Sequence, residues 1–313
     1  IVRSVNARAS TPAWMIEGLA RCGQRSVSPL VDISNYVMFE LGRPSHIFDL
    51  DKIHGGLDVR WARVGESLDL LNGSTVTLDA EVGVIADDAQ VESLAGIMGG
   101  QATAVSDATQ NIYIGAAFWW PQAVAERSRR FRFSTEAGHR FERGVDPEQT
   151  VEHIERITQL VLDICGTPDS VCGPVNDQKL RMPERAAVRL RIARAAKVIG
   201  MPVSQAQCVQ VLERLGLEVA QVEGELSVRP PAYRFDLAHE EDLIEEVARI
   251  VGYGQLPDTP PLAPVTPLLR PERKRSPFAL RRQLAALGYQ ETINFSFVDA
   301  AWERELSGTI DPI

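Results

Sequence analysis

A run of prolines limits the ways in which this chain can fold into compact units. Residues 259–271 hold five prolines, and each proline fixes φ and lacks the backbone N–H that a helix or sheet needs. Such a segment favours an extended, semi-rigid linker. Residues 176–185 are polar and also suit a linker, and a chain of 313 residues is long enough for two or three domains. The sequence therefore predicts three domains, over residues 1–175, 184–256 and 272–313.

Strand and helix patterns occur together along the chain, so we predict an α+β fold. In the first domain, Asn72-Gly73 between two alternating segments indicates a β-hairpin, and residues 147–166 place apolar side chains on one helix face. The second domain has two short helices, the second beginning at the capping residue Ser204, then a strand pair and a helix over 239–254. Residues 273–300 suit a basic amphipathic helix followed by a strand, as the start of a third domain.

The charge of the chain restricts how it can meet nucleic acid. The formal net charge is −9, so the molecule as a whole does not attract RNA and any contact needs a local basic patch. The helix-turn-helix-like pattern of the second domain often contacts nucleic acid, but the slight acidity of that domain favours a packing role.

Several absences in the sequence indicate a cytoplasmic protein. No apolar run is long enough to cross a membrane, and no signal peptide is visible. The sequence has four cysteines, none in a Cys-x-x-Cys pair: Cys22, Cys165, Cys172 and Cys208. Their spacing fits no zinc pattern and suits buried thiols in a reducing compartment. The chain begins at Ile1 and stops at Ile313 inside a domain pattern, so we expect both ends to be cut.

A basic segment stands out in this acidic chain. Residues 127–144, RSRRFRFSTEAGHRFERG, interleave arginines with phenylalanines. Guanidinium groups match phosphate oxygens, and exposed aromatic rings stack on unpaired bases. The alternative is that the arginines pair with the chain's own acids while the phenylalanines belong to the core. The candidate RNA contacts are Arg127, Arg129, Arg130 and Arg132.

Small residues near two of the strands suit a small-molecule site. Glycines in AGIMGGQ let backbone approach a ligand closely, and the STEAGH segment offers exposed N–H groups beside the arginines. His46 follows Pro44 and can shuttle a proton or donate a hydrogen bond, although a lone histidine is more often structural. The candidate residues are His46, Gly99, Gly100, Thr135, Ala137 and Gly138.

An acidic cluster closes the second domain. Three of its members, Asp242, Glu245 and Glu246, are expected to share a helix face opposite the apolar stripe, with Asp236 just upstream. Clustered carboxylates suit a hard ion such as Mg²⁺. The alternative is a solvated acidic face whose charges offset the helix dipole, without any metal.

Taken in order, these segments resemble one family. VDISNYVMFELGRPSHIFDLDKI, AGIMGG, FSTEAGHRFERGVDP, YRFDLAHEEDLIEEVARIVGYGQLP and GYQETINFSFVD resemble successive signatures of the β subunits of bacterial phenylalanyl-tRNA synthetases. The resemblance covers essentially the whole chain. It implies an internal fragment of such a subunit, with an editing module, a small helix-turn-helix-like domain and the truncated start of a class II synthetase-like antiparallel domain.

The resemblance also implies a function and partners. The family's enzyme is an (αβ)₂ heterotetramer that attaches phenylalanine to its tRNA with ATP and Mg²⁺, and the α subunit holds that chemistry. The β subunit contacts tRNA and carries a site that hydrolyses mischarged tyrosyl-tRNA. By motif match, the editing pocket falls on His46, Gly99, Gly100, Gly115, Thr135, Ala137 and Gly138. The family associates Mg²⁺, at the contact with the α subunit, with the positions of Asp236, Asp242, Glu245 and Glu246.

Position 115 departs from the family's pattern. The family usually carries a glutamate there, and this chain has Gly115 in YIGAAFW. That carboxylate is expected to accept a hydrogen bond from the tyrosine hydroxyl, so we expect weakened editing. Two alternatives stay open: a freestanding aminoacyl-tRNA deacylase, and a structural or RNA-binding subunit without chemistry of its own. The unfinished third domain disfavours the former, and Gly115 favours the latter.

Overall fold

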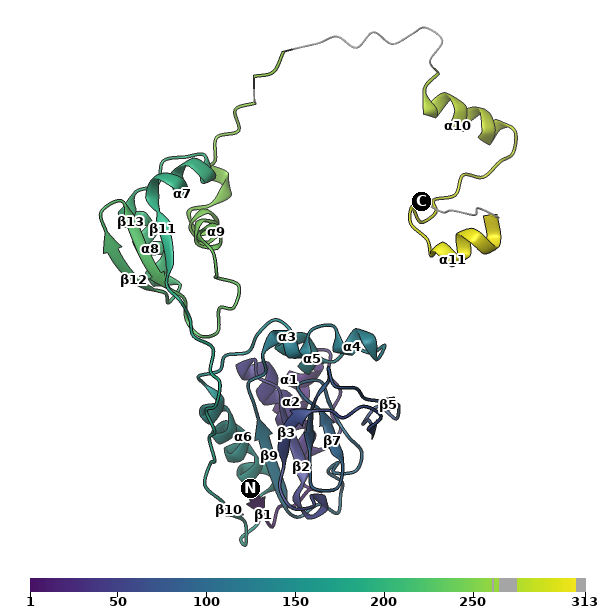
Figure 1. The fold of residues 1–313 in the computed structure, drawn as a ribbon, viewed down its shortest axis with the longest axis vertical. Coiled ribbons are helices and arrows are strands. Elements are labelled where there is room, and N and C mark those ends of the chain that lie inside the picture. The colour runs from purple at the N-terminus through teal and green to yellow at the C-terminus, as the bar shows by residue number, and fades with distance from the viewer. Residues whose placement is uncertain (261, 265–274, 308–313) are drawn as a thin grey trace. The chain divides into compact units, whose positions relative to one another are not determined.

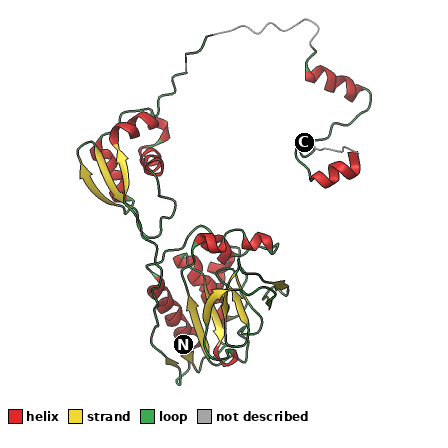
Figure 2. Ribbon diagram, viewed as in Figure 1, coloured by secondary structure: helices red, strands yellow, loops and turns green. Residues whose placement is uncertain are grey.

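The computed structural model describes residues 1–260, 262–264 and 275–307. The chain forms two compact units, Ile1–Pro257 and Asp258–Ile313. Helices and antiparallel sheets make up the first unit (Figures 1 and 2), which confirms the predicted α+β class. Most of the proline run lies outside the described residues, so the extended linker stays a prediction.

A four-stranded antiparallel sheet and three helices enclose the first hydrophobic core. The strands are β1 Val2–Arg3, β2 Ser45–Asp49, β9 Ile112–Ala116 and β10 Val171–Cys172, in the order β10-β1-β9-β2. The helices are α1 Ala13–Arg21, α2 Pro29–Leu41 and α6 Thr150–Cys165. Ile47 of β2 pairs with Ile114 of β9, and both are buried in this core. Because strand side chains alternate, the residues next to them in each strand point to the other face of the sheet.

A second antiparallel sheet follows in the sequence and has its own core. Its strands are β3 Asp58–Trp61, β6 Gly83–Ala86, β7 Val91–Leu94 and β8 Met98–Gly99, in that order across the sheet. A hairpin of β4 (Ser67–Asp69) and β5 (Thr75–Thr77) adds further apolar residues. The predicted turn at Asn72-Gly73 is confirmed, and Gly73 takes the positive φ of 82° that such turns need.

Short helices connect the two sheets to the long helix α6. They are η1 Leu50–Lys52, α3 Pro121–Val124, α4 Arg127–Arg130 and α5 Glu136–Phe141. Phe141 is buried in the second core, and Phe131 and Phe133 pack against it in part. These phenylalanines therefore contribute to the core, as one of the two interpretations of the basic segment expected.

The remaining part of the first unit packs three helices with a three-stranded sheet. Its elements are β11 Val188–Arg191, α7 Ile192–Ile199, α8 Gln205–Arg214, β12 Glu218–Val222, β13 Glu225–Arg229, α9 Glu240–Val251 and η2 Tyr253–Gln255. The sheet order is β11-β13-β12. Ser204 begins α8 with the predicted capping box, its hydroxyl accepting from the N–H of Gln207. The helix predicted over 239–254 is α9.

The second unit has less regular structure among its described residues. Helix α10 runs over Pro277–Ala286, α11 over Ala300–Trp302, and one π-helical turn (η3) over Glu303–Ser307. The strand expected after α10 is absent from residues 288–299, because an alternating segment needs a neighbouring strand to pair with. In the described part of the chain, no helix has the length and apolar character needed to cross a membrane.

Candidate functional site

Three of the predicted pocket residues meet between the two four-stranded sheets of the first unit. His46 and Gly115 are direct partners in the β2–β9 pair, on the face opposite Ile47 and Ile114. Gly99, from β8 of the second sheet, lies against the same face: a Cβ atom at Gly99 would be 2.2 Å from Cε1 of His46. Only glycine permits this approach. The structure thus brings together three of the seven residues that were predicted for the pocket.

The His46 ring is held in an apolar setting. It contacts Phe48 edge to face, with ring centroids 4.3 Å apart. Its Nε2 atom is buried and has no hydrogen-bond partner in the described structure. Burial lowers the pKa of His46 from 6.5 to about 4. The ring is consequently neutral at pH 7, where one of its nitrogens donates and the other accepts.

Gly115 leaves space beside His46. A Cβ atom there would make only ordinary contacts, 3.6 Å to Phe48 and 3.7 Å to Tyr113. The backbone at Gly115 is regular strand, without a positive φ. A Cβ atom is therefore accommodated at this position, on the face of the sheet that carries His46.

The glycine at position 100 is explained by the packing of the second sheet rather than by the His46 face. Its N–H donates to the carbonyl of Glu92 at 2.7 Å, and a Cβ atom would lie 2.7 Å from Leu68. The Glu92 side chain is fully buried and accepts hydrogen bonds from Thr103 at 2.9 Å and Gln90 at 3.0 Å. Gly100 therefore serves the packing of β7 and β8, and no contact joins it to His46.

The STEAGH segment is attached to the turn that precedes β8. The Thr135 hydroxyl accepts from the N–H of Gly138 at 2.9 Å and so caps the start of α5. The same hydroxyl donates to the carbonyl of Ile97 at 2.9 Å. Ala137 packs against the second core. A Cβ atom at Gly138 would come within 2.8 Å of the Ser128 hydroxyl oxygen. These residues thus adjoin the β8 turn, two residues before Gly99.

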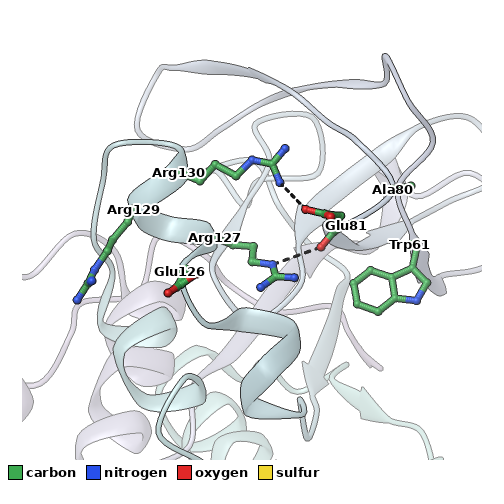
Figure 3. A pocket seen from close by; sticks show the side chains of 7 residues that line it. All are labelled: Trp61, Ala80, Glu81, Glu126, Arg127, Arg129 and Arg130. Carbon is green, nitrogen blue, oxygen red and sulfur yellow. Dashed lines mark hydrogen bonds and ion pairs between the residues drawn. The ribbon is translucent and has the colours of Figure 1, made fainter.

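The basic segment borders a surface hollow of about 730 Å³ (Figure 3). The residues that line it come from β3, the turn before β6 and α4: Trp61, Ala80, Glu81, Glu126, Arg127, Arg129 and Arg130. Arg132 does not line the hollow. Glu126, directly before α4, and Arg132, two residues after it, have a positive φ of 68° and 61°.

The arginines of α4 differ in their partners. Arg130 pairs with Asp79 and lies 3.5 Å from Glu81. Arg127 donates only to backbone carbonyls, those of Glu81 at 3.3 Å and Ala125 at 2.9 Å. The Arg129 side chain is exposed and has no partner among the described residues. Figure 3 shows Arg127 and Arg130 directed toward Glu81, and Arg129 directed away from it. Among the arginines of α4, pairing with the chain's own acids therefore accounts for Arg130 alone; later in the segment, Arg140 pairs with Glu136 and Arg143 with Glu142.

The four predicted metal ligands do not face one another. Arg234 lies between two of them, with Nη2 at 2.7 Å from Asp236 and 3.0 Å from Glu246. Glu246 also accepts from Nε of Arg249 at 2.9 Å. Asp242 accepts from the N–H groups of Ala238 and His239, at 2.8 and 2.6 Å, and so caps the start of α9.

Internal cations thus take the place that a metal would need. The hydrogen bond from Arg234 holds the pKa of Asp236 below its ordinary value, and those from Arg249 and Arg234 do the same for Glu246. Glu246 is buried beside Leu243 and Val247, so the prediction that it lies on the face opposite the apolar stripe was wrong. Among the described residues, no three His, Cys, Asp or Glu side chains gather to hold a metal ion. The arrangement does not fit Mg²⁺ as it stands.

Two residues that organise these sites were not singled out from the sequence. Arg234 lies two positions before Asp236, and a lone arginine at the edge of an acidic cluster is a signal for an internal ion pair. Trp61 ends a strand pattern, where the sequence alone does not distinguish an exposed ring from a buried one.

Comparison with known families matches all three parts of the chain. The model of the B3/4 domain matches residues 1–166, and that of the tRNA synthetase B5 domain matches residues 188–253. The model of the phenylalanyl tRNA synthetase beta chain CLM domain matches residues 256–312. The B3/4 match alone covers more than half of the chain.

Individual relatives carry the same description. The chain is 58% identical over 313 residues to the phenylalanine–tRNA ligase beta subunit of Burkholderia pseudomallei (strain 1710b), and 56% identical to that of Bordetella pertussis (strain Tohama I). In both cases all of this chain is covered, and it spans 38% of the relative's length. A solved N-terminal fragment of the phenylalanyl-tRNA synthetase β subunit from Pyrococcus horikoshii aligns over 81% of this chain and 70% of its own, with 14% identity and a TM-score of 0.35.

Proposed function

The chain belongs to the family of phenylalanine–tRNA ligase β subunits, and on that premise we propose that it serves ATP-dependent attachment of phenylalanine to tRNA in the cytoplasm. Its partners are tRNA and an α subunit that holds the aminoacylation chemistry, in an (αβ)₂ assembly. Mg²⁺ acts with ATP in that reaction. The three matched domains in succession support this proposal. A freestanding deacylase is disfavoured because the CLM match continues past the second domain.

We further propose that residues 1–166 edit mischarged tyrosyl-tRNA. The observation that carries this proposal is the meeting of His46, Gly99 and Gly115 between two sheets. Aromatic rings of Phe48 and Tyr113 border the space at Gly115, as an aromatic amino acid requires. A second site that excludes phenylalanine raises accuracy, because the main pocket rejects an added hydroxyl poorly.

Hydrolysis at this site needs no nucleophilic side chain. Water attacks the ester carbon of the aminoacyl bond, and the released ribose hydroxyl leaves with a proton. A neutral His46 is suited to orient a polar group of the substrate by one hydrogen bond, since its Nε2 has no partner within the described protein. The tRNA's own terminal hydroxyl completes the positioning of the water.

Gly115 makes the proposed editing weak. A site that lacks the acceptor for the tyrosine hydroxyl loses about 1–3 kcal/mol of discrimination. We expect Gly115→Glu, in the complete enzyme, to hydrolyse tyrosyl-tRNA about tenfold faster than the unchanged enzyme. The backbone of β9 accepts a Cβ atom at this position, and a thermal unfolding curve of the variant serves as the folding control. Equal deacylation rates would reject the role of position 115.

A second candidate function is favoured by the same residue. If Gly115 has abolished editing, this region serves as a tRNA contact and structural element, with Arg127, Arg129, Arg130 and Arg132 as the proposed RNA-binding residues. No deacylation by the unchanged enzyme, together with retained tRNA binding and α-subunit binding, would support this second function. Magnesium at Asp236, Asp242, Glu245 and Glu246 remains a prediction that requires these side chains to leave their present partners.

A further inference from the structure

The hollow beside α4 combines an exposed aromatic ring with unneutralised guanidinium groups. Trp61 is 55% exposed at the end of β3, which is an edge strand of its sheet. Gly83 lies behind the ring, and a Cβ atom there would be 4.0 Å from Cζ3 of Trp61. Figure 3 shows Trp61 on the other side of Glu81 from Arg127 and Arg130. A tryptophan held in this way offers a flat apolar surface to a ligand.

The charges around the hollow favour an anionic ligand. Arg127 donates only to backbone carbonyls, and Arg129 has no partner in the described structure, so neither charge is balanced by a carboxylate. Guanidinium groups bind phosphate oxygens through paired N–H donors. Two carboxylates of the lining, Glu81 and Glu126, oppose such a ligand. The Glu81 carboxylate is 78% exposed and its ion pair to Arg130 is long at 3.5 Å, so it is free to rotate away.

We propose that this hollow binds unpaired RNA, with one base stacked on Trp61, the phosphate of that nucleotide held by Arg127, and a neighbouring phosphate of the strand held by Arg129, which is directed away from Glu81. The inference rests on the proposed RNA contact of the basic segment and adds the residue that receives the base. An unpaired nucleotide fits better than a double helix, because a paired base has no free face to stack on a protein ring. An open hollow of about 730 Å³ admits a flexible strand end.

The test measures binding of the 313-residue chain to fluorescently labelled oligoadenylate by anisotropy, at two salt concentrations. We expect Trp61→Ala to weaken binding about tenfold, and Trp61→Phe to keep most of it, because a ring of either kind stacks on a base. Trp14→Ala is the matched control: Trp14 is 49% exposed and lies on α1, outside the hollow. If Trp61→Ala unfolds the chain, Trp61→Leu keeps the apolar bulk and removes the flat ring.

Charge variants separate the base contact from the phosphate contact. Arg127→Gln and Arg129→Gln should each weaken binding and lower the salt dependence by about one counterion, whereas Trp61→Ala should leave the salt dependence unchanged. Glu81→Gln should tighten binding about twofold to threefold, because it removes the repulsion of phosphate.

The outcomes distinguish the two proposals. Loss of binding in the arginine variants with unchanged binding in Trp61→Ala would overturn the role of Trp61 and leave the RNA contact in place. No binding of oligoadenylate by the unchanged chain would overturn both. If Trp61→Ala instead impairs association with the α subunit while RNA binding is unaltered, the hollow is a protein interface and the proposal is wrong.

Discussion

The face around His46 and the acidic cluster around Glu246 were both predicted as sites, and the fold treats them differently. His46, Gly99 and Gly115 are brought together by strand register, which is set by the backbone. The carboxylates Asp236 and Glu246 are also close to one another, but an arginine lies between them. The first site keeps a polar atom without a partner, and the second satisfies its charges internally.

The difference follows from the cost of burying each group. An imidazole becomes neutral at modest cost, so the Nε2 atom of the half-buried His46 can lie buried without a partner. A carboxylate that is 6% exposed, as Glu246 is, needs a cation at all times. A buried polar atom without a partner therefore indicates a ligand more strongly than a group of acids does. Each of the following experiments tests either the His46 face or the acidic cluster around Glu246.

The largest expected effect is a loss of stability at low pH, because the pKa values of two histidines are lowered in the folded chain. The pKa of His46 falls from 6.5 to about 4 by burial, and that of His153 falls equally, by burial and by the nearby Arg43 charge. Between pH 6.5 and 4 the unfolded chain binds more protons than the folded chain, so the free energy of unfolding falls as the pH decreases. Each histidine should remove up to roughly 3 kcal/mol by pH 4. Chemical denaturation at several pH values measures this.

One variant measures how much of this pH dependence of the unfolding free energy comes from His46. His46→Leu should reduce the pH dependence of stability by the contribution of one protonating group, whereas the contribution of His153, a buried residue of α6, should remain. If the pH dependence is the same with and without His46, the ring is already protonated or solvated in the folded chain. The interpretation of His46 as a neutral ring with an unpartnered nitrogen would then be wrong.

Removing the internal cation should give the next largest effect. Arg234→Met leaves Asp236 without its cation and Glu246 with Arg249 alone, and we expect a loss of about 2 kcal/mol in the free energy of unfolding. Arg249→Met is the matched control, because it removes the same charge from a more exposed position and should cost about half as much. Equal small losses from both variants would show that Arg234 is dispensable.

Two glycine variants compare crowded and open positions at the His46 face. Gly99→Ala places a Cβ atom 2.2 Å from the His46 ring, so the ring or strand β8 must shift, at about 1–2 kcal/mol. Gly115→Ala meets only ordinary contacts and should be neutral or slightly stabilising, since alanine restricts the unfolded chain. Thermal unfolding of both proteins measures the difference. Equal stability would contradict the close approach of Gly99.

The sequence predicted what depends on local pattern and register. The hairpin at Asn72-Gly73, the cap at Ser204 and the helix that became α6 follow from residue types at fixed spacing. The burial of Glu246 did not follow, because its partner Arg234 is twelve positions away and only tertiary packing brings them together. The strand expected after α10 failed for a related reason: a strand exists only with a neighbour.

The smallest expected effect is the sharpest test of the acidic cluster. Glu245 is exposed and has no partner among the described residues, so Glu245→Gln should change stability by less than about 0.5 kcal/mol. A metal site at the four carboxylates predicts more: millimolar Mg²⁺ would raise the melting temperature of the unchanged chain, and Glu245→Gln would reduce that rise. Because Arg234 already neutralises two of the carboxylates, we expect Mg²⁺ to leave both melting temperatures unchanged. A rise that is restricted to the unchanged chain would mean that Mg²⁺ displaces Arg234, and the acidic cluster would then be a ligand site like the His46 face.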